Sequence, residues 1–334
     1  MKLSGNLNKF SSVLTSVTVG GQLLVHSHYK VCIFFDCEPS KSAFISPQFL
    51  SATTIASTRT MFKLYGVPLS QPTRSVLWPM LVKGVPFELV LTVPGIDHPK
   101  MGARHENFRS KTKARSITVP LLEDTSRNFN LTESAAILVY LCENPSTNMS
   151  DLYAAPGTTE QATINSYLHW HHTNTRTMGQ IASTYLVKGR RVESEAEQIQ
   201  QQVTLHKMCK RLEEGWMSTA NHSDLYIATE SRPSIADFLC YGEVMQITET
   251  GIMQLESSLE DQYPNLAAWM ERMKTIPFHD EAHASLHELG KLDMATHDAA
   301  SSEFQKKLGT ATKKGMVAIH MAQQAMNKSE DSKL

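Results

Sequence analysis

The chain has 334 residues, a mass of 37.3 kDa and a formal net charge of −1, with a pI near 6.9. This length suits two domains, and 41% hydrophobic with 19% charged residues predicts packed cores rather than disorder throughout. The chain has no basic excess and no apolar run of about 18 residues, so we expect neither a nucleic-acid nor a membrane partner.

The five cysteines are scattered along the chain and form no Cys-x-x-Cys pair. Neither a zinc knuckle nor a dithiol redox motif is indicated. Free thiols in a reducing compartment are the simpler interpretation, which favours a cytoplasmic location. The residues are Cys32, Cys37, Cys142, Cys209 and Cys240.

Residues 1–60 differ in composition from the rest of the chain. They are rich in Ser and Thr and contain two acids, Asp36 and Glu38. Such a composition suits an organelle transit peptide, which would make the location an organelle, although Arg59 is the only arginine where such peptides usually have several. The alternative is that Met61 is the true start and the extension is an artefact of the gene model. In both cases we exclude the segment from the fold.

From Met61 onward, strand and helix patterns alternate. The opening Ser70-Gln71-Pro72 and the closing Lys83-Gly84 mark one helix between two strands. Two apolar runs separated by polar residues then indicate a hairpin. The expected elements are a strand over 62–67, a helix over 70–83, a strand over 86–92, a loop with a weak helix over 98–113, a hairpin over 119–131 and a helix over 132–141. This order predicts a thioredoxin-type α/β domain.

Beyond Asp151 the strand patterns stop, and we expect an all-α domain. The expected helices cover 160–186, 193–217, 234–254 and 264–274. Ser234 and Asp237 have the spacing of a capping box, with Asp in place of the usual Glu. The last stretch, 290–334, is polar and rich in lysine, so we expect a solvated tail with one or two weak helices; a docking helix is the alternative.

Ser70 stands directly after the first expected strand, at the N-cap of the first expected helix. Unpaired backbone N–H groups and the positive end of the helix dipole meet there, so an anion at that point is stabilised. A serine hydroxyl can donate one hydrogen bond to the anion, and a thiolate held in this way has a lowered pKa. The alternative is a plain capping serine, which contributes about 1 kcal/mol to stability.

Two more features flank the expected hairpin. Glu133 and Ser134 open a helix, where a carboxylate beside a hydroxyl and free N–H groups suits the ammonium and carboxylate of an α-amino acid; capping alone also explains both residues. Pro120 stands at the start of a strand, and a cis bond after Val119 would turn the Val119 backbone outward to pair with an extended peptide.

Together these features resemble the glutathione transferases, most closely the theta class, which uses serine rather than tyrosine. The resemblance covers about residues 62–289 and rests on the order and spacing of its motifs. The supporting segments are Lys63-Leu64-Tyr65, Ser70 to Val76, Val119 to Leu122, Leu131 to Ile137 with Tyr140-Leu141, Tyr167 to Thr173 with Arg176, and Arg232 to Asp237.

The resemblance implies a thioredoxin-like glutathione-binding domain over 61–144 and an all-α domain over 151–289. It also implies a role for each matching residue. Ser70 would bond the glutathione sulfur, Glu133 and Ser134 would hold the γ-glutamyl head, Val119 before a cis Pro120 would pair with the cysteinyl part, His105 would contact the glycyl end, Arg176 would lie near the electrophile, and Asp237 would be structural.

The sequence departs from the family pattern at Thr118, where members often carry a Lys. One glycyl contact is therefore missing unless Lys113 or Arg115 supplies it. Tyr65 could be a tyrosine-type activator, but its place inside a strand favours a core role. We expect no metal at the histidines of 169–172, because only His169 and His172 share a helix face and no carboxylate is near.

The expected function is conjugation of the glutathione thiolate to a small hydrophobic electrophile, as in detoxification. Glutathione is a co-substrate, no cofactor is permanently bound, and the family implies a homodimer. The alternatives are a non-catalytic binding or assembly module with the same fold, which the extensions at both ends keep open, and a glutathione-dependent peroxidase or dehalogenase.

Overall fold

The computed structural model describes residues 61–113, 116–187, 192, 194–217 and 226–331. The transit-peptide prediction and Arg115 lie outside these residues. Among the described residues, no helix is both long enough and apolar enough to cross a membrane.

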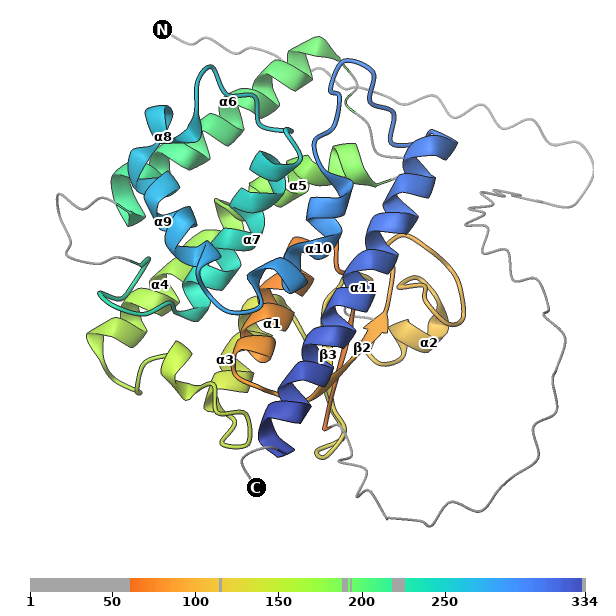
Figure 1. The fold of residues 1–334 in the computed structure, drawn as a ribbon, viewed down its shortest axis with the longest axis vertical. Helices are drawn as coiled ribbons and strands as arrows, with labels where there is room; N and C mark the ends of the chain where they lie inside the picture. Colours follow the sequence, from red (N-terminus) through yellow and green to blue (C-terminus); the bar gives the residue numbers. More distant parts are fainter. Residues whose placement is uncertain (1–60, 114–115, 188–191, 193, 218–225, 332–334) are drawn as a thin grey trace, which may run out of the picture. The chain divides into compact units, whose positions relative to one another are not determined.

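A four-stranded mixed sheet forms the first part of the fold (Figure 1). The strands are β1 (Phe62–Gly66), β2 (Phe87–Leu91), β3 (Leu121–Asp124) and β4 (Phe129–Thr132), in the spatial order β2-β1-β3-β4. β2 is parallel to β1, while β3 is antiparallel to both β1 and β4. With the helices between them, these strands confirm the predicted thioredoxin-like architecture.

Side chains along β1 alternate between the two faces of the sheet, and each face packs into a different core. Phe62 and Leu64 are buried in the main core, together with residues of α1 (Gln71–Val82) and α3 (Ser134–Glu143). Tyr65 points the other way, and its ring meets Phe108 of the short α2 (Glu106–Arg109) with centroids 6.2 Å apart. The second, smaller core therefore lies on the α2 side of the sheet.

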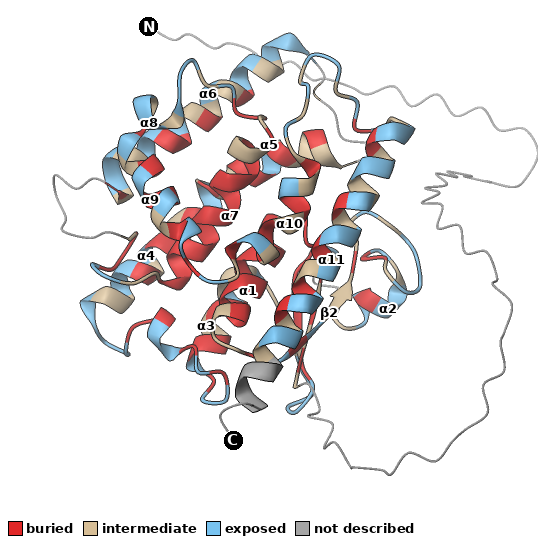
Figure 2. Ribbon diagram, viewed as in Figure 1, coloured by how far each residue is buried: buried red, intermediate tan, exposed pale blue. Residues whose placement is uncertain are grey.

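Helices make up the remainder of the described chain. They are α4 (Thr159–Thr173), α5 (Arg176–Leu186), α6 (Glu195–Arg211), α7 (Ile235–Glu249), α8 (Leu259–Gln262), α9 (Pro264–Lys274), α10 (His279–Leu289) and α11 (Ser302–Asp331), with a 3₁₀ turn at Ser150–Leu152 and a π turn at Leu212–Trp216. α7 is buried over almost its whole length (Figure 2), because α1, α3, α4, α5 and α10 all pack against it.

The helical part joins the sheet part chiefly where α1 packs on α7. Trp78 of α1 is 1% exposed, and its ring makes edge contacts with Phe238 at 4.9 Å and with His283 of α10 at 4.9 Å. Its indole Nε1 donates to the carbonyl of Pro277. Burial of one such aromatic side chain removes roughly 150–250 Å² from water, so this contact holds the two parts together firmly.

Three helical features differ from the sequence prediction. The helix expected over 160–186 is broken at Asn174, whose side chain bonds the carbonyl of Trp170 and whose own carbonyl accepts from the Thr177 hydroxyl. The helix expected to reach 254 ends at Glu249, and α10 was not expected as a helix.

The expectation of a solvated tail after residue 290 was wrong. α11 lies along α10 (Figure 1), with Phe304, Ala311 and Ile319 buried. Its apolar residues recur at a helical spacing and form one buried face. The polar, lysine-rich composition of the segment as a whole made that face hard to recognise in the sequence. The docking-helix alternative is the one that the structure contains.

Candidate active site

Strand register brings three of the predicted site segments to one edge of the sheet. Tyr65 pairs with Leu121, and Leu121 pairs with Thr132. The turn after β1, the residues before β3 and the residues after β4 must therefore lie side by side. Ser70, Val119 and the Glu133–Ser134 pair belong to those three segments, so the constellation expected from sequence order is also a spatial one.

Ser70 is the N-cap of α1, but its hydroxyl makes no capping hydrogen bond. A capping hydroxyl normally accepts from the N–H of the second or third helical residue, and the second residue here is Pro72, which has no N–H. The backbone of Ser70 is fixed by its amide, which donates to the carbonyl of Val67 at 2.9 Å. Among the described residues the half-buried hydroxyl has no hydrogen-bond partner, and it remains able to bind another molecule.

Arg74 holds the turn that carries Ser70, a role that sequence reasoning missed. Its guanidinium is fully buried and donates to the carbonyls of Pro68 at 3.2 Å and Leu69 at 2.8 Å, and to Oε1 of Gln246 at 2.7 Å on α7. Burial lowers the pKa of Arg74 to about 10, against the opposing effect of Glu243, so the group stays charged at neutral pH. A single charged residue four positions after Ser70, inside an otherwise neutral helix, was the available signal.

The Val119–Pro120 peptide bond is cis, as the family resemblance implied. The Val119 side chain is 7% exposed. Its backbone N–H and C=O lie just before the β3 ladder, and within the described chain neither makes a hydrogen bond. These two groups therefore resemble an open strand edge, which is the kind of surface that pairs with an extended peptide.

Glu133 and Ser134 open α3 in an unusual backbone conformation. Glu133 has φ 71° and ψ 112°, which is uncommon for a residue with a side chain, and its carboxylate is exposed and makes no capping bond. Ser134 is half-buried in the first turn, where the amide N–H groups of the helix lack internal partners. The pair therefore presents an acceptor carboxylate beside a set of donors.

His105 and Arg176 are the more peripheral candidates. His105 caps α2, since its Nδ1 accepts from the amide of Asn107 at 3.2 Å, which leaves Nε2 without a described partner. Arg176 opens α5, and its Nη1 donates to Oε1 of the buried Glu243 at 2.9 Å. Its guanidinium is thus already paired with a carboxylate, and Glu243 is a contact that sequence reasoning did not identify.

Asp237 has the structural role that the resemblance implied. Its carboxylate accepts from the amides of Ile227 and Ser234, from the Ser234 hydroxyl and from the indole of Trp269. Burial raises the pKa of Asp237, and these four donors oppose the shift. The capping box predicted at the start of α7 is confirmed.

Four further chemically active side chains, on β1, α3, α4 and α6, are occupied or buried. The Tyr65 hydroxyl donates to Glu123 at 2.5 Å, and burial raises the pKa of Tyr65, which disfavours the tyrosine-activator alternative. His171 bonds the Thr175 hydroxyl, and Glu243 lies 4.0 Å from its Nε2, so a carboxylate is nearer than the sequence suggested. Burial raises the pKa of the Cys142 and Cys209 thiols to about 12.

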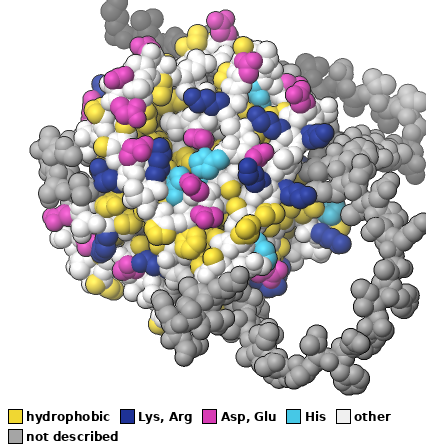
Figure 3. Space-filling model, in the orientation of Figure 1, with side chains coloured by type: hydrophobic (Ala, Val, Ile, Leu, Met, Phe, Trp, Pro, Cys, Tyr) yellow, Lys and Arg dark blue, Asp and Glu magenta, His cyan; other side chains and the backbone are white. Residues whose placement is uncertain are grey.

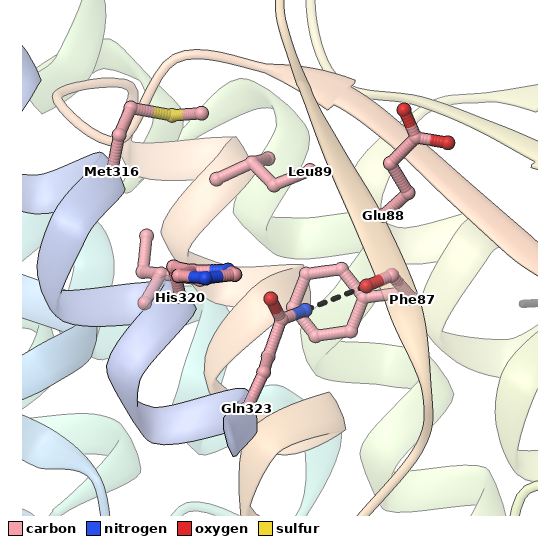
Figure 4. Close-up of a pocket in the computed structure, with 7 residues that line it drawn as sticks. Phe87, Glu88, Leu89, Met316, His320 and Gln323 are labelled. Carbon is pink, nitrogen blue, oxygen red and sulfur yellow. Dashed lines mark hydrogen bonds between the residues drawn. The ribbon is translucent and has the colours of Figure 1, made fainter. Parts of the chain in front are cut away.

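The segment 289–311 covers part of this edge. Leu289, Ala299, Phe304 and Ala311 share the second core with Val67, Leu69 and Val119 of the candidate site. Farther along, α11 runs beside the edge strand β2, where Gln323 donates to the carbonyl of Phe87 (Figure 4). The groove between them, of about 380 Å³, is lined by Phe87, Glu88, Leu89, Met316, Ile319, His320 and Gln323, and Ser70 is not part of it.

The known proteins to which this chain is similar include glutathione transferases. Residues 64–149 match the family model for the glutathione S-transferase N-terminal domain. The chain is 28% identical over 269 residues to glutathione S-transferase T1 of Arabidopsis thaliana, an alignment that covers 76% of this chain and 97% of that protein. It is 28% identical over 231 residues to glutathione S-transferase theta-1 of Gallus gallus, covering 64% and 82% respectively.

Human glutathione transferase theta-2, solved in complex with glutathione, has the same fold with a TM-score of 0.56 at 23% identity, covering 75% of this chain and 98% of that one. The thioredoxin-like sheet followed by a helical region is the architecture of the glutathione transferases. Residues 64–149 therefore form a glutathione S-transferase N-terminal domain, and the chain as a whole is similar to theta-class glutathione S-transferases, which are enzymes.

Proposed function

We propose that this protein conjugates glutathione to small apolar electrophiles, with the Ser70 hydroxyl donating a hydrogen bond to the glutathione sulfur. The free hydroxyl of Ser70 at the start of α1 is the observation that supports this best. A thiolate at that point also meets unpaired N–H groups and the helix dipole. Each unit by which these interactions lower the thiol pKa corresponds to about 1.4 kcal/mol.

Glutathione would bind in an extended form along the sheet edge. Its ammonium suits the exposed Glu133 carboxylate, and its γ-glutamyl carboxylate suits Ser134 with the N–H groups that open α3. The backbone of Val119 would pair with the cysteinyl part, and Nε2 of His105 would donate to the glycyl carboxylate. Two copies of the chain would form the homodimer that the family implies.

In the reaction, the thiol proton leaves to solvent and the sulfur attacks an electrophilic carbon. A sulfur–carbon bond forms, and the leaving group departs with its bonding electron pair. The protein contributes a lowered thiol pKa and the orientation of two reactants. Phe304 and Ala311 of the covering segment would help to exclude water from the site, which favours apolar substrates.

The test compares two N-cap serines. Ser70→Ala should bind glutathione with little change but lose most of its turnover of a haloaromatic electrophile, and the ultraviolet thiolate absorbance of bound glutathione should shift to higher pH. Because the Ser70 hydroxyl makes no capping bond, the unfolding midpoint should stay constant. Ser258→Ala, which removes a real cap bond to Asp261, should lose about 1 kcal/mol of stability and no turnover.

Equal turnover in wild type and Ser70→Ala would remove Ser70 from the mechanism. Failure of the wild type to bind immobilised glutathione would instead favour a non-catalytic module. One observation favours that second candidate: Leu69 and Val119 are buried by the covering segment, at 9% and 7% exposure. Turnover by the full chain decides between the two.

A further inference from the structure

A cluster of metal-ligating side chains lies on α10, apart from the candidate active site. His279, Asp280 and His287 each offer one ligand atom, and these atoms all lie within 4.8 Å of one another. Histidine and acidic side chains are visible side by side in the middle of the molecular face over which α10 runs (Figure 3). The sequence pattern gave no sign of this group, because the histidines with a suggestive spacing lie on α4 and α10 was not expected as a helix.

The far ring nitrogen of each histidine is already held by an oxygen atom. Nε2 of His279 lies 2.7 Å from the hydroxyl of Tyr241, and Nδ1 of His287 lies 3.3 Å from a carboxylate oxygen of Glu249. When each of these nitrogens carries the proton and donates it, the opposite nitrogen keeps its lone pair. Histidines that bind metals are almost always oriented by such partners.

The near atoms face a common point. Nδ1 of His279 is 2.9 Å from Oδ1 of Asp280, and Nε2 of His287 is 4.0 Å from the same oxygen. Ligands placed tetrahedrally around Zn²⁺ at its usual bond length are about 3.3 Å apart. Because the three ligand atoms all lie within 4.8 Å of one another, a movement of His287 by about 1.5 Å or less completes the site. Its side chain is 38% exposed and that of Asp280 is 88% exposed, so both can rotate.

His279, in contrast, is fixed in place. Its side chain is 7% exposed, and its ring stacks on the buried His283 with centroids 4.7 Å apart. Tyr241 and Glu249, which hold the two histidines from behind, both belong to α7. An ion at this point would therefore join one rigid and two adjustable ligands, all three of them on α10.

We propose that His279, Asp280 and His287 form a Zn²⁺ site with one coordination position open to solvent. Two imidazole nitrogens and one carboxylate oxygen favour Zn²⁺ over Mg²⁺ and Ca²⁺, which prefer oxygen ligands throughout. The carboxylates of Asp280 and Glu249 supply negative charge, while Lys274 is the positive side chain that acts on His279. The site does not depend on the glutathione reaction.

The experiment uses the full chain without a tag and stripped of metal. Calorimetric titration with Zn²⁺ should show one saturable equivalent, and Co²⁺ should give the intense visible absorption of a four-coordinate site. His287→Gln and Asp280→Asn should each weaken Zn²⁺ binding about tenfold or more, and Glu249→Gln should weaken it about tenfold through His287. His172→Gln, which alters an exposed histidine of α4, is the control and should bind like wild type.

A second readout follows because an ion that binds only the folded chain stabilises it. At the same Zn²⁺ concentration, the unfolding midpoint should rise more for wild type and His172→Gln than for His287→Gln. His287 and Asp280 are exposed, so their variants should fold normally without metal. The proposal is overturned if wild type shows no saturable Zn²⁺ equivalent, or if His287→Gln and Asp280→Asn bind Zn²⁺ as wild type does.

Discussion

Replacing Asp237 with alanine should destabilise the protein far more than its motif alone suggests. The carboxylate is fully buried and accepts four hydrogen bonds, from the Ile227 amide, the Ser234 amide and hydroxyl, and the Trp269 indole. In Asp237→Ala, the two amides and the indole lose their acceptor and have no water to replace it. At about 1–3 kcal/mol for each buried unsatisfied donor, the lower bound is about 3 kcal/mol.

Relief of the buried carboxylate offsets part of this loss, because burial raises the pKa of Asp237 and so disfavours its charged form. We therefore expect a net loss of about 3–5 kcal/mol, against a total stability of about 5–15 kcal/mol. Asp237→Asn keeps one acceptor for Ile227 and Trp269 but turns an NH₂ group toward Ser234, so its loss should be smaller than that of alanine.

Urea unfolding followed by circular dichroism and tryptophan fluorescence measures the loss. The matched control is Asp261→Ala, because Ser258 and Asp261 repeat the Ser-x-x-Asp spacing on the exposed start of α8. That variant should lose about 1 kcal/mol or less. If Asp237→Ala and Asp261→Ala lose the same free energy, burial of the donors is not the cause and the reasoning fails.

Three further predictions concern other buried groups. Burial lowers the pKa of His171 to about 3 from 6.5, so the stability it contributes is present above pH 6.5 and declines as the pH falls toward 3. In His171→Gln, the slope of the free energy of unfolding against pH should be smaller by about 1.4 kcal/mol per pH unit in this range. A Cβ on Gly315 would meet Pro68 at 2.9 Å, so Gly315→Val should cost about 1–3 kcal/mol and speed proteolysis of α11. Arg176→Met leaves Glu243 buried without its partner and should cost about 3–5 kcal/mol, of which Glu243→Gln in the same chain restores at least about 1 kcal/mol.

For each of these three predictions, one experimental result would contradict it. A pH profile of unfolding that is parallel in wild type and His171→Gln would show that the pKa of His171 is the same in the folded and unfolded states. Gly309 lies on the same helix with open space around it, so Gly309→Val must be less damaging than Gly315→Val. For Arg176, a double variant that is no more stable than the single one would mean that Glu243 is not its energetic partner.

Local patterns were enough to predict the sheet domain. The strands around β1 carry alternation and turn signals, and Pro72 with Gly84 marks both ends of α1. The cis bond at Pro120 followed from the family resemblance rather than from the residues, since most bonds before proline are trans. Elements whose boundaries are set by neighbouring residues in the sequence were thus the ones that sequence reasoning placed correctly.

What the sequence did not reveal depends on contacts between distant segments. Arg74 holds the Ser70 turn through Gln246, a residue 172 positions away, and nothing in either local pattern pairs them. α10 and α11 are rich in charged and histidine side chains, so their buried stripes are visible only once α7 and β2 provide a surface. Polar composition predicted solvent exposure for α11, and its packing partners reversed that outcome.

Two features prepare the Ser70 hydroxyl to bind a thiolate. A neighbouring proline leaves the hydroxyl free, and a contact with a distant helix fixes its position. Pro72 removes the nearer of the two amide donors that a capping serine would bind, which leaves the hydroxyl unused. A free hydroxyl on a loose turn would not stabilise a thiolate well, because the geometry must exist before the charge forms. Arg74, buried on α1, supplies that rigidity: it binds the carbonyls of Pro68 and Leu69 and is itself held by Gln246 of α7. The helical part of the fold therefore fixes the residue that we expect to activate the thiol.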